Sequence, residues 1–275
     1  MSDLSWRWVS ASVTGTSHTV SGMECQDSHF CNEIQTPEGP VLLTFVSDGA
    51  GSAAKSAIGS RLVCDVLFDK SLEFFRDDGR VSQLTLRLIA NWIQFFRDEV
   101  ILQAAADGLS DRDYACTLLG AIVAEKAAAL FQVGDGAIVY TTQPNEQTPT
   151  LAFWPERGEY ENTTFFITQS TFLDQMQFCL IPERIFELAL LSDGLQRIAL
   201  NYQTKTAHAP FFSGLFAPLR MTPKRDALAL STKLAEYLDS PKVNDRTDDD
   251  KTLILATSLD SEFLTEKRMD VSGTR

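Results

Sequence analysis

The sequence has few of the residues from which thiol and zinc sites are built. Its 275 residues include only three histidines and five cysteines, and the cysteines are scattered along the chain. An odd number of widely spaced cysteines predicts reduced thiols rather than a disulfide framework. The three histidines form no H-E-x-x-H motif, so the sequence does not predict a zinc site of that type.

Basic residues and long apolar runs are also scarce. The chain has 24 basic against 37 acidic residues, a net charge of −13. Such a surface repels nucleic acid, so we expect no nucleic-acid partner. No run reaches the ~18 apolar residues that a membrane span needs, and the first residues do not have the pattern of a signal peptide. We therefore expect a cytoplasmic protein with no membrane partner.

Hydrophobic residues make up 44% of the chain, and their spacing changes along it. Helical spacing predicts two consecutive long helices over 52–77 and 81–108, which we expect to lie as an antiparallel pair on a sheet. A proline-punctuated segment over 199–222 is typical of a long loop with a helical turn or two, and a further helix is expected over 224–239. Strands are expected over 6–16, 41–46, 114–125, 127–142, 150–154, 163–169, 186–194 and 251–258.

These elements predict one α+β domain over 1–275, with a core from about residue 10 to 257 and a C-terminal tail over 258–275. The chain contains no low-complexity linker and no internal repeat that would divide it. The helical pair separates the first strands from the later ones, so we expect strands from both sides of it to assemble together.

Carboxylates recur where apolar strands begin or end. Asp48 closes the strand-like run in LLTFVSDGAGSA, the same Asp-Gly pair returns at Asp135 and Asp193, Asp249 lies just before the last strand, and Asp27 lies near the N-terminus. A glycine after the aspartate lets the chain turn and leaves the carboxylate at the strand tip. Asp-Gly is also the commonest hairpin turn, which explains any one of these sites alone. Five together would gather negative charge that cations must neutralise, and oxygen ligands favour Mg²⁺ or Mn²⁺.

Six short motifs occur in a characteristic order and spacing. They are QD at 26–27, SDGAGSA at 47–53, CTLLGAIV at 116–123, VGDG at 133–136, LLSDGL at 190–195 and DDKTLIL at 249–255. In this order they resemble the metal-dependent PP2C-type protein serine/threonine phosphatases, and above all the divergent bacterial branch of that family. The resemblance covers nearly the whole chain, from about residue 10 to 257.

The resemblance implies a four-layer α/β/β/α sandwich of two antiparallel sheets flanked by helices. It also implies two Mg²⁺ or Mn²⁺ ions at one edge of the sandwich, with a further, weaker third ion. By this resemblance, Asp48 would bridge both ions, and the backbone carbonyl of Gly49 would complete one coordination sphere. Asp193 and Asp249 would hold the first ion. Asp27 would anchor waters on the second, and Asp135 would support the third.

The implied activity is hydrolysis of phosphoserine and phosphothreonine by a metal-activated water, with Asp48, Asp193 and Asp249 as the catalytic carboxylates. The substrate would be a protein phosphorylated by a cognate Ser/Thr kinase. The small residues over 50–53 would leave room for substrate beside Asp48. No covalent phosphoenzyme is needed, because paired metal ions can activate water and hold the phosphoryl oxygens.

The chain departs from the family pattern at three places. Gln26 stands where many relatives have glutamate, and Ala50 stands where some animal members have a histidine proposed as general acid. The arginine that holds substrate phosphate in better-known members has no match just upstream of Gln26. His18 and Lys55 are weak candidates for that role, because an ordinary loop or strand histidine and a solvated helix lysine explain them more simply.

Two other functions fit the same residues. A non-catalytic module that binds phosphoproteins would explain Gln26, Ala50 and the missing arginine, and a phosphohydrolase for small phosphate esters would use the same carboxylates. Thiol phosphatase chemistry is excluded, because no cysteine is followed six positions later by arginine. An EF-hand starting at Asp245 is excluded as well, because the required glycine and glutamate positions hold Asp250 and Ala256.

Overall fold

The computed structural model of the chain describes residues 6–144, 146, 148–155 and 164–258. Ten strands form two five-stranded sheets in which every pairing is antiparallel. The β3 sheet consists, in spatial order, of β2 (Ser28–Thr36), β3 (Gly39–Ser47), β4 (Leu118–Val123), β5 (Ala128–Val133) and β8 (Gln177–Ile181). The β12 sheet consists of β1 (Arg7–Val13), β12 (Lys251–Thr257), β9 (Glu187–Leu191), β6 (Ala137–Thr141) and β7 (Thr150–Leu151).

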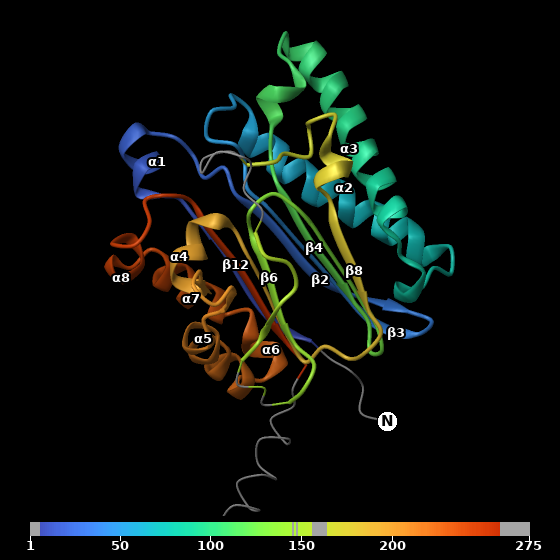
Figure 1. Cartoon of the computed structure of the whole chain (residues 1–275), viewed down its shortest axis with the longest axis vertical. Helices are drawn as coiled ribbons and strands as arrows, with labels where there is room; N and C mark the ends of the chain where they lie inside the picture. Colours follow the sequence, from blue (N-terminus) through green and yellow to red (C-terminus); the bar gives the residue numbers. More distant parts are fainter. Residues whose placement is uncertain (1–5, 145, 147, 156–163, 259–275) are drawn as a thin grey trace, which may run out of the picture.

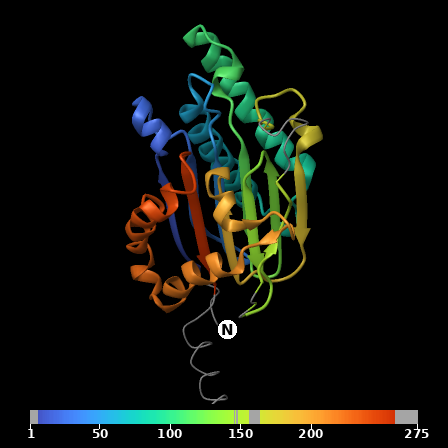
Figure 2. The same cartoon turned by 60° about the vertical axis from the view of Figure 1, so that its left-hand side comes forward.

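Helices cover the outer face of each sheet, as Figures 1 and 2 show. The β3 sheet carries α2 (Ser56–Arg76) and α3 (Leu86–Asp107), and η2 (Asp111–Tyr114) leads from α3 back to the sheet. The β12 sheet carries α4 (Gln196–Ala199), α5 (Ala209–Met221), α6 (Lys224–Ala227), α7 (Leu230–Leu238) and α8 (Pro241–Asn244). The remaining short elements are α1 (Thr16–Ser21), η1 (Val81–Gln83), η3 (Phe172–Gln175), η4 (Asp193–Leu195), β10 (Leu200–Asn201) and β11 (Thr206–Ala207).

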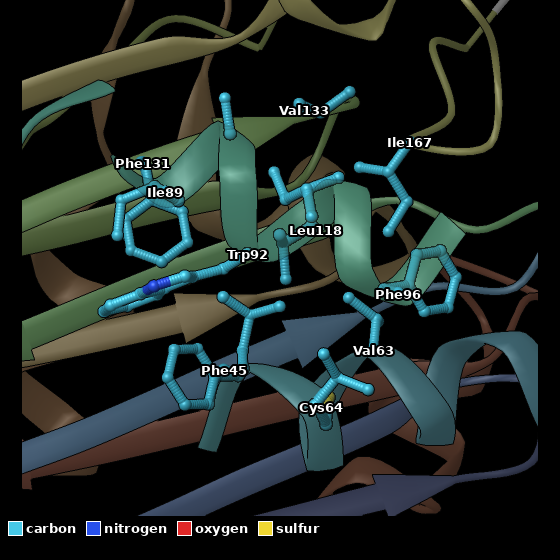
Figure 3. Packing of buried hydrophobic residues seen from close by; sticks show 14 of the residues in the cluster. Phe45, Val63, Cys64, Ile89, Trp92, Phe96, Leu118, Phe131, Val133 and Ile167 are labelled. Atoms are coloured by element: carbon cyan, nitrogen blue, oxygen red, sulfur yellow. The ribbon is translucent and has the colours of Figure 1, made fainter. Parts of the chain in front are cut away.

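Alternate residues of the central strands enter different layers of the core. In β3, Phe45 packs with Trp92 of α3 in the cluster drawn in Figure 3, whereas Leu42 packs in the cluster between the two sheets. A third cluster joins the β12 sheet to its helices, with Leu255 and Phe212 among its buried members. Because both faces of these strands are covered, their sequences are nearly continuous apolar runs. The predicted four-layer α/β/β/α sandwich is therefore confirmed.

The expected strand over 163–169 is wrong for its described part, residues 164–169. This segment forms turns. Its fully buried residue Ile167 packs in the core beneath α3, and the N–H of Ile167 donates to the carbonyl of Cys116 at 3.0 Å. The strand on the outer side of β5 is β8 instead, and both β8 and β2 lie in segments for which the sequence did not predict a strand. The predicted tail over 258–275 lies outside the described residues except for Ser258.

The expected loop over 199–222 contains a full helix. α5 begins at Ala209 directly before Pro210, a position where the fixed φ of proline favours helix formation. Pro218 lies inside the same helix, so neither proline marks a break. Phe212, Phe216 and the rest of the inner face of α5 pack on the β12 sheet, and this packing outweighs the local signal of the prolines. The helix expected over 224–239 is divided into α6 and α7.

Candidate active site

Strand pairing places the predicted carboxylates at one edge of the sandwich. Ser28 of β2 pairs with Ser47 of β3, so Asp27 and Asp48, one residue outside each strand, lie at the same end of that pair. In the other sheet, Leu191 of β9 pairs with Leu253 of β12, so that Asp193 and Asp249 also leave their strands at one end. The antiparallel register alone therefore brings each pair of carboxylates together.

The four carboxylates of these two pairs, from opposite sheets, act on one another. Burial raises the pKa of Asp48 well above its usual value, and the negative charges of Asp27, Asp193 and Asp249 raise it further. A hydrogen bond between the side chains of Asp48 and Asp193 acts in the same direction. We refer to Asp27, Asp48, Asp193 and Asp249 as the carboxylate cluster.

Asp27 is the most enclosed member of the cluster. Its Oδ2 accepts a hydrogen bond of 2.7 Å from the hydroxyl of Ser192, the residue directly before Asp193. Burial raises the pKa of Asp27 to about 7, although hydrogen bonds from Ser192 and Thr252 partly oppose this shift. Asp27 is therefore held by neutral hydroxyl donors, which bring no positive charge to the cluster.

Asp250 positions the cluster without belonging to it. Its side chain is 3% exposed, and its two oxygens accept 2.6 Å hydrogen bonds from the backbone N–H groups of Gly15 and Gln26. These bonds tie the start of β12 to both ends of the segment that carries α1, and so fix the backbone directly before Asp27. The backbone N–H of Asp250 also donates to Oδ1 of Asp249 at 2.9 Å. The sequence placed Asp250 in the acidic run but did not distinguish its role.

Asp135 lies at the same end of the β12 sheet as Asp193. Ala137 of β6 pairs with Leu191 of β9, so both aspartates lie two residues beyond this pair. Thr164 donates a 3.0 Å hydrogen bond to Oδ2 of Asp135, and the side chain amide of Gln196 donates to its backbone carbonyl. α4, which follows Asp193 in the chain, therefore holds the loop of Asp135 in place.

A glycine allows two of the carboxylate-bearing loops to meet. A Cβ atom at Gly194 would collide with the backbone carbonyl of Asp250, so only glycine permits this approach of the Asp193 loop to the start of β12. The same kind of packing occurs at Gly49, where a side chain would meet the carbonyl of Gln26. The glycines of the Asp-Gly motifs thus allow close contact between segments as well as tight turns.

The two candidates for phosphate binding occupy different surroundings. Nδ1 of His18, which is 8% exposed, lies 3.0 Å from Oδ1 of Asp250. Lys55 precedes α2 and lines a cavity of about 430 Å³ together with Gln26, Gly51 and Ser52. Among the described residues that line this cavity, Lys55 is the cation. Gln26 in the wall of this cavity directly precedes Asp27 in the chain.

The donors present fit a hard divalent cation. Carboxylate oxygens carry uncompensated charge, and the side-chain oxygen of Gln26 is buried without a hydrogen-bond partner in the described part of the chain. Within that part, no three His, Cys, Asp or Glu side chains already surround one point as the ligands of an ion. Burial and the charges of Asp27, Asp193 and Asp249 raise the pKa of Asp48, and a bound cation would favour the ionised carboxylates.

Several supporting residues were not predicted from the sequence. Ser192 donates to Asp27, Gln196 holds the Asp135 loop, and the hydroxyl of Thr117 accepts from the backbone N–H of Asp48 at 3.0 Å. Ser192 directly precedes the pair Asp193-Gly194, so a hydroxyl next to a predicted site residue was the signal in the sequence that could have suggested its supporting role. The contacts of Thr117 and Gln196 depend on pairing between distant segments, which no local pattern reveals.

Comparison with known proteins agrees with this arrangement of strands and carboxylates. A family model described as "Protein phosphatase 2C" matches residues 14–239. The chain belongs to the protein phosphatase 2C family. The matched residues include Asp27, Asp48, Asp135 and Asp193, and end before Asp249. The predicted family and the predicted class of enzyme, a protein phosphatase, are therefore confirmed.

Individual relatives extend the match over more of the chain. Serine/threonine-protein phosphatase 3 of Escherichia coli (strain K12) is 35% identical over 260 residues, which cover 92% of this chain and 98% of that protein. Serine/threonine phosphatase Stp1 from Staphylococcus aureus is 17% identical with a TM-score of 0.58, covering 92% of this chain and 94% of that one. The catalytic domain of the phosphatase PstP, in complex with 2 manganese ions, is 15% identical with a TM-score of 0.56 and coverage of 92% and 97%. The last two show a common fold.

None of the helices in the described ranges has both the length and the apolar character needed to cross a bilayer.

Proposed function

We propose that this protein phosphatase is a metal-dependent protein serine/threonine phosphatase that releases phosphate from phosphoserine and phosphothreonine through a two-metal site. The observation that carries the proposal is the convergence of four carboxylates from both sheets at one edge of the sandwich, where burial and the neighbouring negative charges raise the pKa of Asp48. A protein retains buried, uncompensated carboxylates at a stability cost, and the commonest reason is function. The manganese ions of the PstP complex support the same reading.

The side chains of the carboxylate cluster, with the backbone carbonyl of Gly49, would hold two Mg²⁺ or Mn²⁺ ions, and Asp135 would support a third. When bound, these ions lower the pKa of a water and polarise the phosphoryl group. The chain itself contributes the arrangement: Ser192 orients Asp27, and Asp250 fixes the loop of Gln26. The small residues over 50–53 leave space beside Asp48 for a phosphorylated side chain. The substrate is a protein phosphorylated by a cognate Ser/Thr kinase.

Lys55 is the better candidate for contact with the substrate phosphate. It lines the cavity next to Gln26 and lies at the start of α2, where its ammonium group can reach an anion in the cavity. His18 is buried against Asp250, and this contact explains its presence without a substrate. Of the two predicted candidates, the surroundings therefore favour Lys55.

The proposal is tested by replacing Asp48 or Asp193 with asparagine. Both variants should lose Mn²⁺-dependent release of phosphate from a phosphothreonine peptide by about 10³-fold or more, because each removes a charge that the metal ions need. Circular dichroism should show an unchanged fold. Asp245→Asn, an exposed carboxylate outside the cluster, is the matched control and should keep full activity.

Turnover like that of the wild type in either cluster variant would contradict the proposal. Binding of the phosphopeptide by the wild type without release of phosphate would instead identify the non-catalytic module, for which neutral Gln26 is the specific reason. Rates on metabolite phosphates above those on phosphopeptides would identify the small-ester phosphohydrolase.

A further inference from the structure

A second cavity lies among the helices that cover the β12 sheet. It has a volume of about 800 Å³ and is formed by α4, β10, α5 and the segment from α7 through α8. Figure 1 shows these helices grouped together, on the side of the molecule opposite α2 and α3. None of the residues of the carboxylate cluster lines it, and neither does Asp135 or Lys55. The cavity is therefore separate from the candidate active site.

The charge of this cavity is opposite to that of the molecule. Arg197, Lys242 and Arg246 line it together with His208, and the described residues of its wall include no aspartate or glutamate. This composition is unexpected in a chain with 37 acidic and 24 basic residues. Unpaired cations that face one concave surface raise the local concentration of anions.

The three cations are available to a ligand. Arg197, Lys242 and Arg246 are exposed, and none of them forms a salt bridge with another residue in the described ranges. Arg197 belongs to α4, whereas Lys242 and Arg246 come from α8 and the turn after it. Groups from two separate segments therefore surround the same space, which allows them to contact one anionic group from different sides.

The rest of the wall is apolar and aromatic. Phe211, Leu215 and Tyr237 contribute carbon surface, and Tyr202 adds a ring whose hydroxyl donates to Gln196 at 2.6 Å. Cavities of roughly 300–1,000 Å³ with apolar walls and a few convergent polar groups are typical of small-molecule sites. A simple inorganic anion would leave this apolar surface uncovered.

We propose that this cavity is a binding site for a small organic anion, a carboxylate, sulfonate or phosphate ester with an apolar or aromatic body. The anionic group contacts Arg197, Lys242 and Arg246, and the apolar body lies against Phe211, Leu215 and Tyr237. Gly214 forms part of the wall, and a Cβ atom there would meet no other atom within 4 Å. The space in front of this glycine is therefore open to a ligand.

The site is tested with 1-naphthalenesulfonate and isothermal titration calorimetry on the full chain. Metal ions are first removed with EDTA, and the chelator is then removed by dialysis, so that no bound metal ion attracts the probe to the carboxylate cluster and no other organic carboxylate competes with it. We expect saturable 1:1 binding that weakens as salt is raised. The neutral analogue 1-naphthol should bind at least tenfold more weakly, because it lacks the anionic group.

Two independent variants separate the charge of the cavity from its shape. The triple variant Arg197→Gln/Lys242→Gln/Arg246→Gln should weaken binding at least tenfold, and Gly214→Phe should block it by filling the open space. The matched control Arg76→Gln/Arg87→Gln/Lys126→Gln removes the same charge from exposed positions on the other side of the molecule and should change the affinity less than twofold.

The proposal is overturned if the wild type shows no saturable binding up to millimolar probe. It is also overturned if the neutral analogue binds equally well, or if the triple and control variants behave alike. Retained binding by a folded Gly214→Phe variant, as judged by circular dichroism, would overturn it too. Because no turnover is measured, these outcomes do not depend on the proposed phosphatase activity.

Discussion

Asp249 and Asp250 are neighbours in the chain with opposite surroundings. Asp249 is exposed at the carboxylate cluster, whereas Asp250 is buried and accepts two backbone hydrogen bonds. Two backbone N–H donors compensate the charge of Asp250, whereas the charges of the carboxylate cluster repel one another. One carboxylate is therefore available to a ligand, and the next one maintains the structure that presents it.

Replacing Asp250 by alanine should destabilise the protein strongly. The change removes two hydrogen bonds to a buried charge and leaves the N–H groups of Gly15 and Gln26 without acceptors, at a cost of about 3 kcal/mol. Urea unfolding in EDTA measures this cost. Asp248→Ala, which removes an exposed carboxylate two positions away, should change the free energy of unfolding by less than about 0.5 kcal/mol. Equal effects of the two variants would contradict the role given to Asp250.

Replacing Lys55 by glutamine should affect substrate binding more than chemistry. The variant loses a cation that lines the cavity beside Gln26, so KM for a phosphothreonine peptide should rise by roughly three- to tenfold with a smaller change in kcat. Steady-state kinetics with Mn²⁺ measure both constants. Lys126→Gln, in the turn between β4 and β5, should leave KM unchanged. A His18→Gln variant that raised KM more than Lys55→Gln would reverse the assignment.

At the level of the elements, α2 lies exceptionally close to η2. A Cβ atom at Gly59 of α2 would collide with the backbone carbonyl of Tyr114, the last residue of η2. This contact holds the start of α2, and with it Lys55, against the segment that leads into β4. The backbone N–H of Lys55 also donates to the carbonyl of Asp113 at 2.7 Å.

Two glycine-to-alanine substitutions in helices should have opposite effects. Gly59→Ala should lower the free energy of unfolding by about 2 kcal/mol, because the backbone must move to admit the methyl group. Gly214→Ala in α5 has open space and should raise it by about 0.5 to 1 kcal/mol, since alanine favours the helix. Thermal and urea unfolding of both variants measure these changes. Stabilisation by Gly59→Ala would show that α2 and η2 are not in tight contact.

The elements also show what the sequence can and cannot predict. Strong periodicity predicted α2, α3 and most strands, and the order of the Asp-Gly motifs predicted the aspartates that antiparallel pairing brings to one edge. α5, β2 and β8 were missed, because the prolines in α5 suggested a loop and neither β2 nor β8 carries a distinctive alternation of buried and exposed residues. Contacts such as that of Ser192 with Asp27 join residues far apart in the chain, so only the assembled sheets reveal them.

Across the whole molecule, the cluster adds concentrated charge to a chain whose net charge is already −13. The pKa of Asp48 lies well above its usual value, chiefly because of burial, so the folded state binds a proton that the unfolded state has released. The free energy of unfolding therefore falls as pH rises above about 4, until the folded carboxyl ionises. Burial lowers the pKa of His29, which acts in the opposite direction, so the effect of Asp48 must be measured by difference.

In EDTA, Asp48→Asn should be more stable than the wild type, and its advantage should grow between pH 5 and pH 8. The difference in the free energy of unfolding should grow by up to about 1.4 kcal/mol for each pH unit, the value for release of one proton. The contribution of His29 cancels in this difference because both proteins contain it. Saturating Mn²⁺ should remove or reverse the advantage by stabilising only the wild type. Urea unfolding at both pH values tests this. An advantage that is independent of pH and of Mn²⁺ would contradict the charge repulsion inferred for the cluster.

The pairing of β1 with β12, seen in Figure 1 as a blue strand beside a red one, has a consequence for protein synthesis. A ribosome delivers Asp27, Asp48, Asp135 and Asp193 long before it delivers Asp249, yet β1 has no neighbour in its sheet until β12 arrives. A nascent or prematurely terminated polypeptide can therefore pair β2 with β3 and β6 with β9, but it lacks Asp249 and the strand that joins β1 to its sheet. Under the proposed function, hydrolytic capacity would then appear in one step, once β12 has been synthesised and paired with β1 and β9.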